Sequence, residues 1–399
     1  MNLIAHVAKN SIVAIAAIVF ISCAASYGQN PPSNPNDKSA ERRLNMLVLG
    51  DSIMWGEGLK DEHKAWYQVK VWLNRTAGRE VREKIEAHSG AVVGSVGDPP
   101  ANSVTPFDGE VNSAVPSVND ELDMAVKSYA DPSQVDLVLV DGCVNDVGVF
   151  NLLNGGNSTE EIDKLASSRC GPPMRALLKR VADAFPSAHI IVTGYFPIIS
   201  EKTPDSLLMR AVAKLFYRSS PGASKVNSNQ LRERLVANSR FWYQASNAAL
   251  ADAVRHTNDE IATGRPRQRV LFVQIPFPPE YSFAAKETRL WSFNASFLRK
   301  LLAIITLGKI SLRTNDEQRR QRIASCDDFY KRPANEDKQQ KQTRELRRML
   351  CYYASIGHPN RKGALIYSQA IIDQVKSAIG DAGWLRDLGP VTVPNSPVR

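Results

Sequence analysis

The sequence of 399 residues lacks the patterns that mark several common classes of protein. Its five cysteines form no Cys-x-x-Cys pair, which argues against a zinc site or a thioredoxin-type redox motif. It has no internal repeats and no zinc-finger, RNA-binding or helix-turn-helix signature, so we expect no nucleic-acid partner. It also has no Gly-x-Ser-x-Gly elbow, which excludes the α/β-hydrolase arrangement of a serine nucleophile.

The N-terminal segment has the order of regions found in a secretory signal peptide. An apolar run from Ser11 to Ser22 follows Lys9 and precedes small residues, so residues 1–28 are predicted to be a signal peptide. Cys23 lies in a loose match to a bacterial lipobox, which leaves a membrane tether through a lipid on Cys23 or through the signal segment as an alternative. Residues 29–43, rich in Asn, Pro and Ser, are predicted to be a disordered linker. We therefore expect an exported protein, periplasmic or extracellular.

The four cysteines that follow the signal region are an even number, which favours disulfide bonds in an exported chain. Of the three pairings, we favour Cys143–Cys170 and Cys326–Cys351, because these cysteines are neighbours in the sequence. Four buried thiols are the alternative.

Basic residues give the chain a net charge of +9 and gather in one segment. This segment is either a solvated helical face or a surface that attracts an acidic polymer or an anionic membrane. Its basic residues are Arg319, Arg320, Arg322, Lys338, Lys341, Arg344, Arg347 and Arg348.

Near-continuous apolar runs alternate with helical spacing along most of the chain, which indicates a parallel sheet covered on both faces. The expected strands are Met46–Leu49, Val81–His88, Val135–Val140, His189–Thr193 and Val270–Ile275. The expected helices are Lys64–Ala77, Asn119–Tyr129, Glu160–Ala184 and Ala364–Ile379. The predicted fold class is α/β, a three-layer α/β/α sandwich with a parallel sheet of about five strands.

We assign residues 44–385 to one domain and residues 386–399 to a C-terminal tail. Two regions, at about 200–265 and 276–351, exceed what a three-layer sandwich needs. Both follow the carboxyl end of a strand, so we interpret them as insertions that form a cap or a substrate wall. Extra packing on the flank of the sheet is the alternative.

Ser52 is a candidate nucleophile because Gly50-Asp51-Ser52 ends the first strand and precedes a helix, at the edge where such sheets bind ligands. Ester hydrolysis by serine also needs a base and donors aimed at the developing oxyanion. His358, just before the last helix, is the candidate base. The candidate donors are the backbone N–H groups of Ser52 and Gly90, with Gly94 as the alternative to Gly90, and the side-chain amide of Asn145.

These marks occur in an order that resembles the SGNH hydrolases, the superfamily of GDSL-type esterases and lipases. The marks are Gly50-Asp51-Ser52, Gly90, Gly142 through Asn145-Asp146, and His358-Pro359-Asn360. The resemblance implies a flavodoxin-like sandwich in which Ser52 is the nucleophile, His358 is the base, and Gly90 and Asn145 are oxyanion donors.

The sequence departs from the SGNH pattern at the acid of the catalytic triad. The family usually has Asp three residues before the histidine, and this chain has Ser355 there. Either a Ser–His dyad operates, with Ser355 or a main-chain carbonyl orienting the ring, or a remote acid serves. Asp327 and Asp328 are the candidates for a remote acid, because a Cys326–Cys351 bridge would bring them close. Without a carboxylate, His358 is expected to titrate near an ordinary histidine.

The sequence thus predicts an exported serine esterase that forms an acyl-enzyme on Ser52 and uses neither a metal nor a cofactor. Its substrate would be a small-molecule or polymer ester. One alternative is a polysaccharide acetyl-esterase or O-acyltransferase. Another is a weakly catalytic or non-catalytic protein that binds the cell envelope or carbohydrate and retains the fold.

Overall fold

A computed structural model describes residues 43–94, 117–206, 209–210, 213, 217, 228–262, 269–292 and 316–378. The predicted signal peptide, Cys23, nearly all of the predicted linker and the predicted tail lie outside the described residues. No helix in the described ranges is long and apolar enough to cross a membrane. The same ranges contain no cluster of His, Cys, Asp or Glu side chains that could hold a metal ion.

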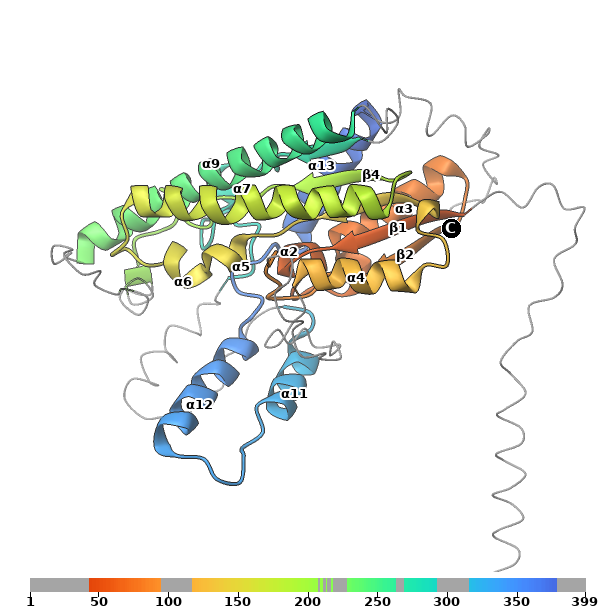
Figure 1. The fold of residues 1–399 in the computed structure, drawn as a ribbon. Helices are drawn as coiled ribbons and strands as arrows, with labels where there is room; N and C mark the ends of the chain where they lie inside the picture. The colour runs from red at the N-terminus through yellow and green to blue at the C-terminus, as the bar shows by residue number, and fades with distance from the viewer. Residues whose placement is uncertain are drawn as a thin grey trace, which may run out of the picture. The chain divides into compact units, whose positions relative to one another are not determined.

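The centre of the fold is a parallel sheet of five strands in the order β2-β1-β3-β4-β5 (Figure 1). The strands are β1 (Leu44–Leu49), β2 (Val81–Ile85), β3 (Val135–Val140), β4 (His189–Thr193) and β5 (Val270–Val273). All five expected strands are present, although β2 and β5 end earlier than the sequence suggested. The sheet is parallel because helical crossovers separate successive strands.

Side chains alternate between the two faces of the sheet, and each face packs against helices. Leu47 and Leu49 of β1 join one core, and Met46 and Val48 join the other. The first core includes α4 (Val118–Ser128), α7 (Thr159–Ala184) and α9 (Ser228–Ile261). The second includes α3 (Ala65–Ala77) and α13 (Arg361–Ala378). The three-layer α/β/α sandwich predicted from the sequence is confirmed.

Capping residues explain where two of the core helices begin. Ser117 precedes α4 and forms a capping box with Asp120, in which each side chain bonds to the other residue's backbone. Ser158 and Glu161 form the same arrangement at the start of α7. Short helical segments connect the main elements: η1 (Asp61–His63), η2 (Pro132–Gln134), η3 (Pro279–Tyr281), α2 (Ser52–Trp55), α5 (Val144–Val147) and α6 (Val149–Leu152).

The first predicted insertion supplies sheet packing where the structure describes it. Trp242, Leu250 and Val254 of α9 are buried in the same core as the strands. The prediction of a cap is therefore wrong for this helix, and the alternative of packing on the flank of the sheet is right. The second insertion contains α11 (Arg319–Phe329) and α12 (Lys338–Tyr352), which we call the α11–α12 hairpin.

Candidate active site

The turn after β1 presents Ser52 at the carboxyl edge of the sheet. Gly50 adopts a φ of +133°, and a Cβ atom there would lie 2.0 Å from Asp141 Oδ1, so only glycine fits. The Asp51 carboxylate accepts a hydrogen bond of 2.9 Å from the Ile53 N–H and caps α2, which begins at Ser52. The glycine and the cap together fix the position of the serine.

His358 reaches this serine from the far end of the chain. Its Nε2 atom lies 2.6 Å from Ser52 Oγ, although 306 positions separate the two residues in the sequence. The backbone of His358 accepts a hydrogen bond of 2.7 Å from Trp291 N–H, and Asn360 caps the start of α13 with its side-chain oxygen. The structure therefore brings the predicted nucleophile and the predicted base into hydrogen-bond contact.

The environment of His358 keeps the imidazole neutral. Burial, and then the positive charge of Arg322, lower the pKa of His358 to about 4. The carbonyls of Ala354, Ser355 and Ile356 act in the opposite direction without forming a hydrogen bond to its buried Nδ1 within the described ranges. The expectation of an ordinary histidine is therefore wrong, because no sequence pattern indicated the desolvation of the ring or the charge of Arg322 beside it.

The loops after β2 and β3, the strands on either side of β1, carry the other two predicted oxyanion donors. Gly90 follows β2 with a φ of +85°, and Asn145 lies in α5 after β3. The Asn145 amide donates one hydrogen bond of 2.8 Å to the Ala91 carbonyl, which leaves its second N–H available. Among the described residues, neither Ser52 N–H nor Gly90 N–H has a hydrogen-bond acceptor.

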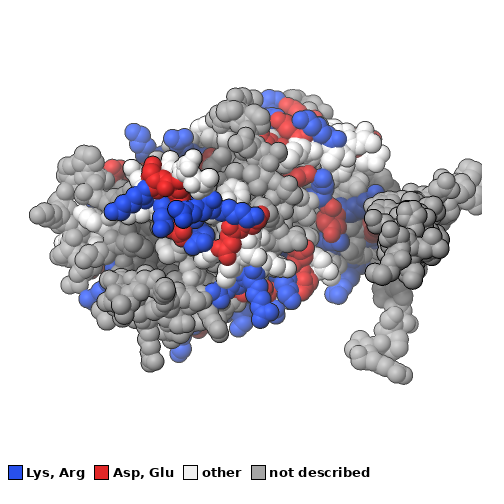
Figure 2. Space-filling model, turned by 90° about the horizontal axis from the view of Figure 1, so that it is seen from below, with Lys and Arg blue, Asp and Glu red and all other residues white. Residues whose placement is uncertain are grey.

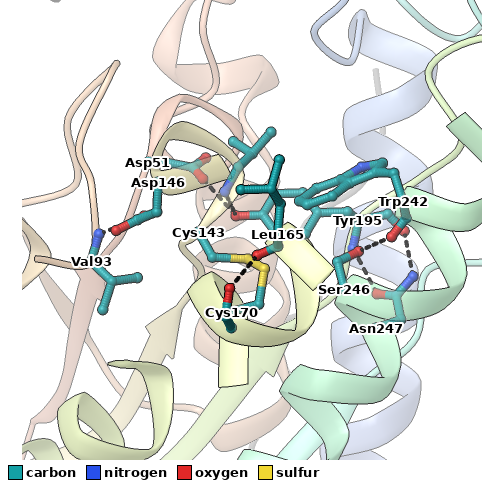
Figure 3. The surroundings of a disulfide bond; sticks show 12 residues. Asp51, Val93, Cys143, Asp146, Leu165, Cys170, Tyr195, Trp242, Ser246 and Asn247 are labelled. Carbon is teal, nitrogen blue, oxygen red and sulfur yellow. Dashed lines mark hydrogen bonds between the residues drawn. A yellow bond between two sulfur atoms is a disulfide. The ribbon is translucent and has the colours of Figure 1, made fainter. Parts of the chain in front are cut away.

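A disulfide bond holds the loop that carries Asn145. Cys143 joins Cys170 of α7, as predicted, and both cysteines are fully buried. Cys143 has a φ of +112°, a conformation that costs free energy for any residue with a Cβ atom. Figure 3 shows this bond beside Asp51 and Asp146. The sequence had two residues between Gly142 and Asn145 where the SGNH pattern has one, and the structure fits them with positive φ angles at Gly142 and Cys143.

Comparison with known proteins found similar solved structures. No family model and no curated protein matches this chain. An extracellular lipase from Streptomyces rimosus is 16% identical over 63% of this chain and 89% of its own, with a TM-score of 0.37. A phospholipase A1 from Streptomyces albidoflavus is 13% identical over 63% and 88%, with a TM-score of 0.39. A GDSL-like lipase from Parabacteroides merdae is 11% identical over 83% and 94%, with a TM-score of 0.31.

The chain resembles the SGNH hydrolases. The resemblance rests on the order of the motifs and on the contact between Ser52 and His358 at the edge of a parallel sheet. The residue at the SGNH acid position, Ser355, makes no hydrogen bond to the imidazole among the described residues. Its hydroxyl donates a hydrogen bond of 2.9 Å to Asp316 Oδ2, and Arg322 Nη1 lies 3.4 Å from the same hydroxyl.

Neither predicted remote acid approaches His358 in the described structure. Asp327 accepts a hydrogen bond from Tyr352 and lies 3.6 Å from Arg348, both on α12. Asp328 pairs with Lys331 at the end of α11. Both aspartates are exposed and bind side chains of their own hairpin, although the Cys326–Cys351 bridge that suggested them is present. The hypothesis that either one is a triad acid is therefore wrong for this structure.

Three buried carboxyl groups lie beneath the nucleophile turn, which the sequence analysis did not anticipate. Gly50 N–H donates to Glu121 Oε2 at 2.7 Å, and Asp51 N–H donates to Asp141 Oδ1 at 2.7 Å. Tyr195 OH donates to Asp51 Oδ2 at 2.7 Å (Figure 3). Burial raises the pKa of Asp51 to about 6 and raises those of Glu121 and Asp141 well above their ordinary values. These groups hold the turn through its backbone.

The basic residues of the second insertion are interspersed with acidic ones. Figure 2 shows Lys and Arg side chains lying beside Asp and Glu side chains on the face that it presents. Within the α11–α12 hairpin, Arg344 pairs with Glu336 and Glu345, and Arg348 pairs with Glu345. This pairing is typical of a solvated helical face.

Proposed function

We propose that this protein is a serine ester hydrolase that forms an acyl-enzyme on Ser52. The observation that carries the proposal is the 2.6 Å contact between Ser52 Oγ and His358 Nε2. A neutral imidazole with its proton on Nδ1 accepts the serine hydroxyl proton at Nε2, and this is the arrangement that activates a serine nucleophile. The lowered pKa of His358 favours this neutral form over a wide pH range.

The proposed reaction has two steps that use the same groups. Ser52 Oγ attacks the ester carbonyl while His358 Nε2 takes the hydroxyl proton, and the carbonyl oxygen becomes an oxyanion. The N–H groups of Ser52 and Gly90 and the Asn145 amide stabilise this charge. The oxyanion collapses, and His358 gives its proton to the departing alcohol. Water, deprotonated by His358, then attacks the acyl-enzyme carbonyl. The second oxyanion collapses, the bond to Ser52 Oγ breaks, and His358 returns the proton to this oxygen as the carboxylic acid leaves.

We also propose that the protein is exported. Its support is the pair of disulfide bonds, Cys143–Cys170 and Cys326–Cys351, because such bonds persist mainly in oxidising compartments. The segment predicted to direct export, residues 1–28, lies outside the described residues.

Ser52→Ala tests the proposed function. We expect it to abolish hydrolysis of a short-chain aryl ester and labelling by a fluorophosphonate, because it removes the attacking oxygen. Stability should change little, since Ser52 buries little apolar surface. Ser246→Ala is a matched control, because Ser246 is also buried but donates its hydrogen bond to the Trp242 carbonyl. Hydrolysis by Ser52→Ala at the rate of Ser246→Ala would end the serine-hydrolase proposal.

A further inference from the structure

Arg322 lies at the centre of a buried network directly behind the candidate base. Its Nε atom is 3.0 Å from Glu57 Oε1, and its Nη1 atom is 2.9 Å from Asp316 Oδ2. The side chains of all three residues are fully buried. Ser355 completes the network, because its hydroxyl donates to the same oxygen of Asp316 and lies within 3.4 Å of the guanidinium. A planar guanidinium suits such a position because its donors point in several fixed directions.

Two partners of Arg322, Glu57 and Ser355, belong to the two loops that carry the catalytic candidates. Glu57 follows Gly56, the C-cap of α2, the helix that begins with the candidate nucleophile. It accepts a hydrogen bond from Ser89 in the loop after β2. Ser355 lies three residues before His358, and the His358 N–H donates to the Ser355 carbonyl at 2.9 Å. One side chain from α11 thus connects the nucleophile loop with the base loop.

The residue next to Asp316 makes a second set of contacts with the same two loops. Glu317 N–H donates to the Gly58 carbonyl at 2.9 Å, and its carboxylate accepts from Lys60 N–H at 2.9 Å. The same carboxylate pairs with Arg361 at the start of α13. Gly58 lets the loops approach closely, since a Cβ atom there would lie 2.7 Å from Ser355 Cβ. These contacts fix the segment that carries Arg322 in place.

We propose that Arg322 is a positioning residue for His358, acting through Ser355 and Asp316, in a chain that lacks the usual SGNH acid. A triad aspartate orients the imidazole directly. Here the buried network holds the backbone of residues 354–356, whose carbonyls face the ring. This inference rests on the proposed function, because positioning has a consequence for rate only if His358 is a base.

Because Arg322 is charged, its effect on the pKa of His358 distinguishes a positioning role from a purely structural one. Arg322 lowers the pKa of the His358 ring together with burial, and its effect outweighs that of the Glu57 and Asp316 carboxylates beside it. The carbonyls of residues 354–356 act in the opposite direction, and Ser52 faces the ring as a neutral hydroxyl. Removing the Arg322 charge should therefore raise the pKa of His358, whereas replacing arginine by lysine should leave much of the effect.

Three variants and one control separate these effects. Arg322→Lys keeps the positive charge but loses the planar guanidinium group that contacts both Glu57 and Asp316. The double variant Arg322→Gln with Asp316→Asn removes one charge of each sign, so the net charge of the network does not change, and Glu57 keeps its hydrogen bond from Ser89. Ser355→Ala removes the hydroxyl that connects Asp316 to the loop of His358, and it changes the side-chain volume only a little. Arg344→Lys is the control, because Arg344 is a partly buried arginine of the same hairpin that pairs with Glu336 and Glu345.

We expect kcat to fall about 10- to 100-fold in the three test variants, with KM within about twofold, because a small displacement of a base has this cost. Arg344→Lys should keep the wild-type kcat. NMR titration of the His358 ring should show a higher pKa in the double variant and little change in Arg322→Lys. If the double variant fails to fold, Arg322→Lys and Ser355→Ala decide the matter by kcat.

Three results would overturn the inference. Active wild-type enzyme with test variants as fast as Arg344→Lys would end the positioning role alone, and so would a His358 pKa that the double variant leaves unchanged. Wild-type protein that neither hydrolyses an ester nor reacts with a fluorophosphonate at Ser52 would instead end the proposed function, and the inference with it.

Discussion

At the scale of single residues, the candidate base, His358, is half-buried and is held neutral by its surroundings. The pKa of His358 is lowered to about 4 by burial and by Arg322. A triad aspartate would have the opposite effect, because a carboxylate stabilises the charged ring. The same environment therefore keeps the base ready to accept a proton and makes its imidazolium form less stable.

This environment predicts the pH dependence of hydrolysis. Only the neutral ring can accept the Ser52 proton, so kcat/KM should rise with pH through the pKa of His358. Because that pKa is lowered to about 4, activity should persist well below pH 6.5. A pH–rate profile with a substrate that is stable in acid measures this rise of kcat/KM. Circular dichroism over the same pH range shows whether the protein stays folded. An inflection near 6.5 in folded protein would contradict the prediction, unless Asp51→Asn removes it, since the pKa of Asp51 is about 6.

Asn145 provides the second prediction at this scale. Its amide is anchored by one hydrogen bond to the Ala91 carbonyl, so its other N–H can point to the oxyanion. Asn145→Ala should lower kcat by about 100- to 1,000-fold and leave folding intact. Asn151→Ala is a matched control, because Asn151 also donates to a main-chain carbonyl, that of Val147, at 2.7 Å. Equal values of kcat for the two variants would show that Asn145 does not reach the oxyanion.

At the scale of elements, the two disulfide bonds lie in different surroundings. Cys143–Cys170 connects the loop before α5 with α7 inside the main core. Cys326–Cys351 connects α11 with α12, where it forms a small separate cluster with Phe329, Tyr330 and Tyr352. The first bond stabilises the sandwich, and the second holds together the hairpin that carries Arg322.

Removing each bond should therefore have a different consequence. Their sequence separations of 27 and 25 predict similar losses, about 3 kcal/mol each, from loop entropy alone. Cys143→Ala with Cys170→Ala should lower the free energy of global unfolding. Cys326→Ala with Cys351→Ala should loosen α11 and lower kcat, with a smaller effect on global unfolding.

Denaturant unfolding followed by circular dichroism, together with kcat for each pair, measures both effects. Full turnover by the variant lacking Cys326–Cys351 would show that the hairpin does not need its disulfide to hold Arg322. An unchanged global stability without Cys143–Cys170 would show that the main core compensates for the lost bond.

At the scale of the whole molecule, the strand order brings the candidate site together. The order β2-β1-β3 places the loops that carry Gly90, Ser52 and Asn145 side by side at one edge. His358 enters from the loop before α13, and Arg322 enters from the α11–α12 hairpin. The sandwich thus supplies the candidate nucleophile and its candidate donors, whereas the C-terminal part supplies the candidate base and the residues that surround it.

The sequence by itself determined the sandwich, the order of the motifs and the cysteine pairs. Apolar runs such as Val135–Val140 are buried on both faces, so their pattern identifies strands without any knowledge of their neighbours. Glycine and serine at the ends of these runs identify the active edge, because parallel strands share it. The pairing of Ser52 with His358 followed from this rule and from the resemblance to the SGNH hydrolases.

Only the tertiary structure decided what surrounds His358 and what the two insertions do. Arg322 stood in the sequence as one basic residue among many, and Asp316 had no pattern at all. Their burial beside Glu57 and Ser355 depends on how a hairpin packs against two distant loops. Likewise, α9 packs on the sheet because Trp242 and its neighbours find an apolar surface there. Local sequence patterns record periodicity and turns, but long-range packing decides which charges are buried and which pKa values shift.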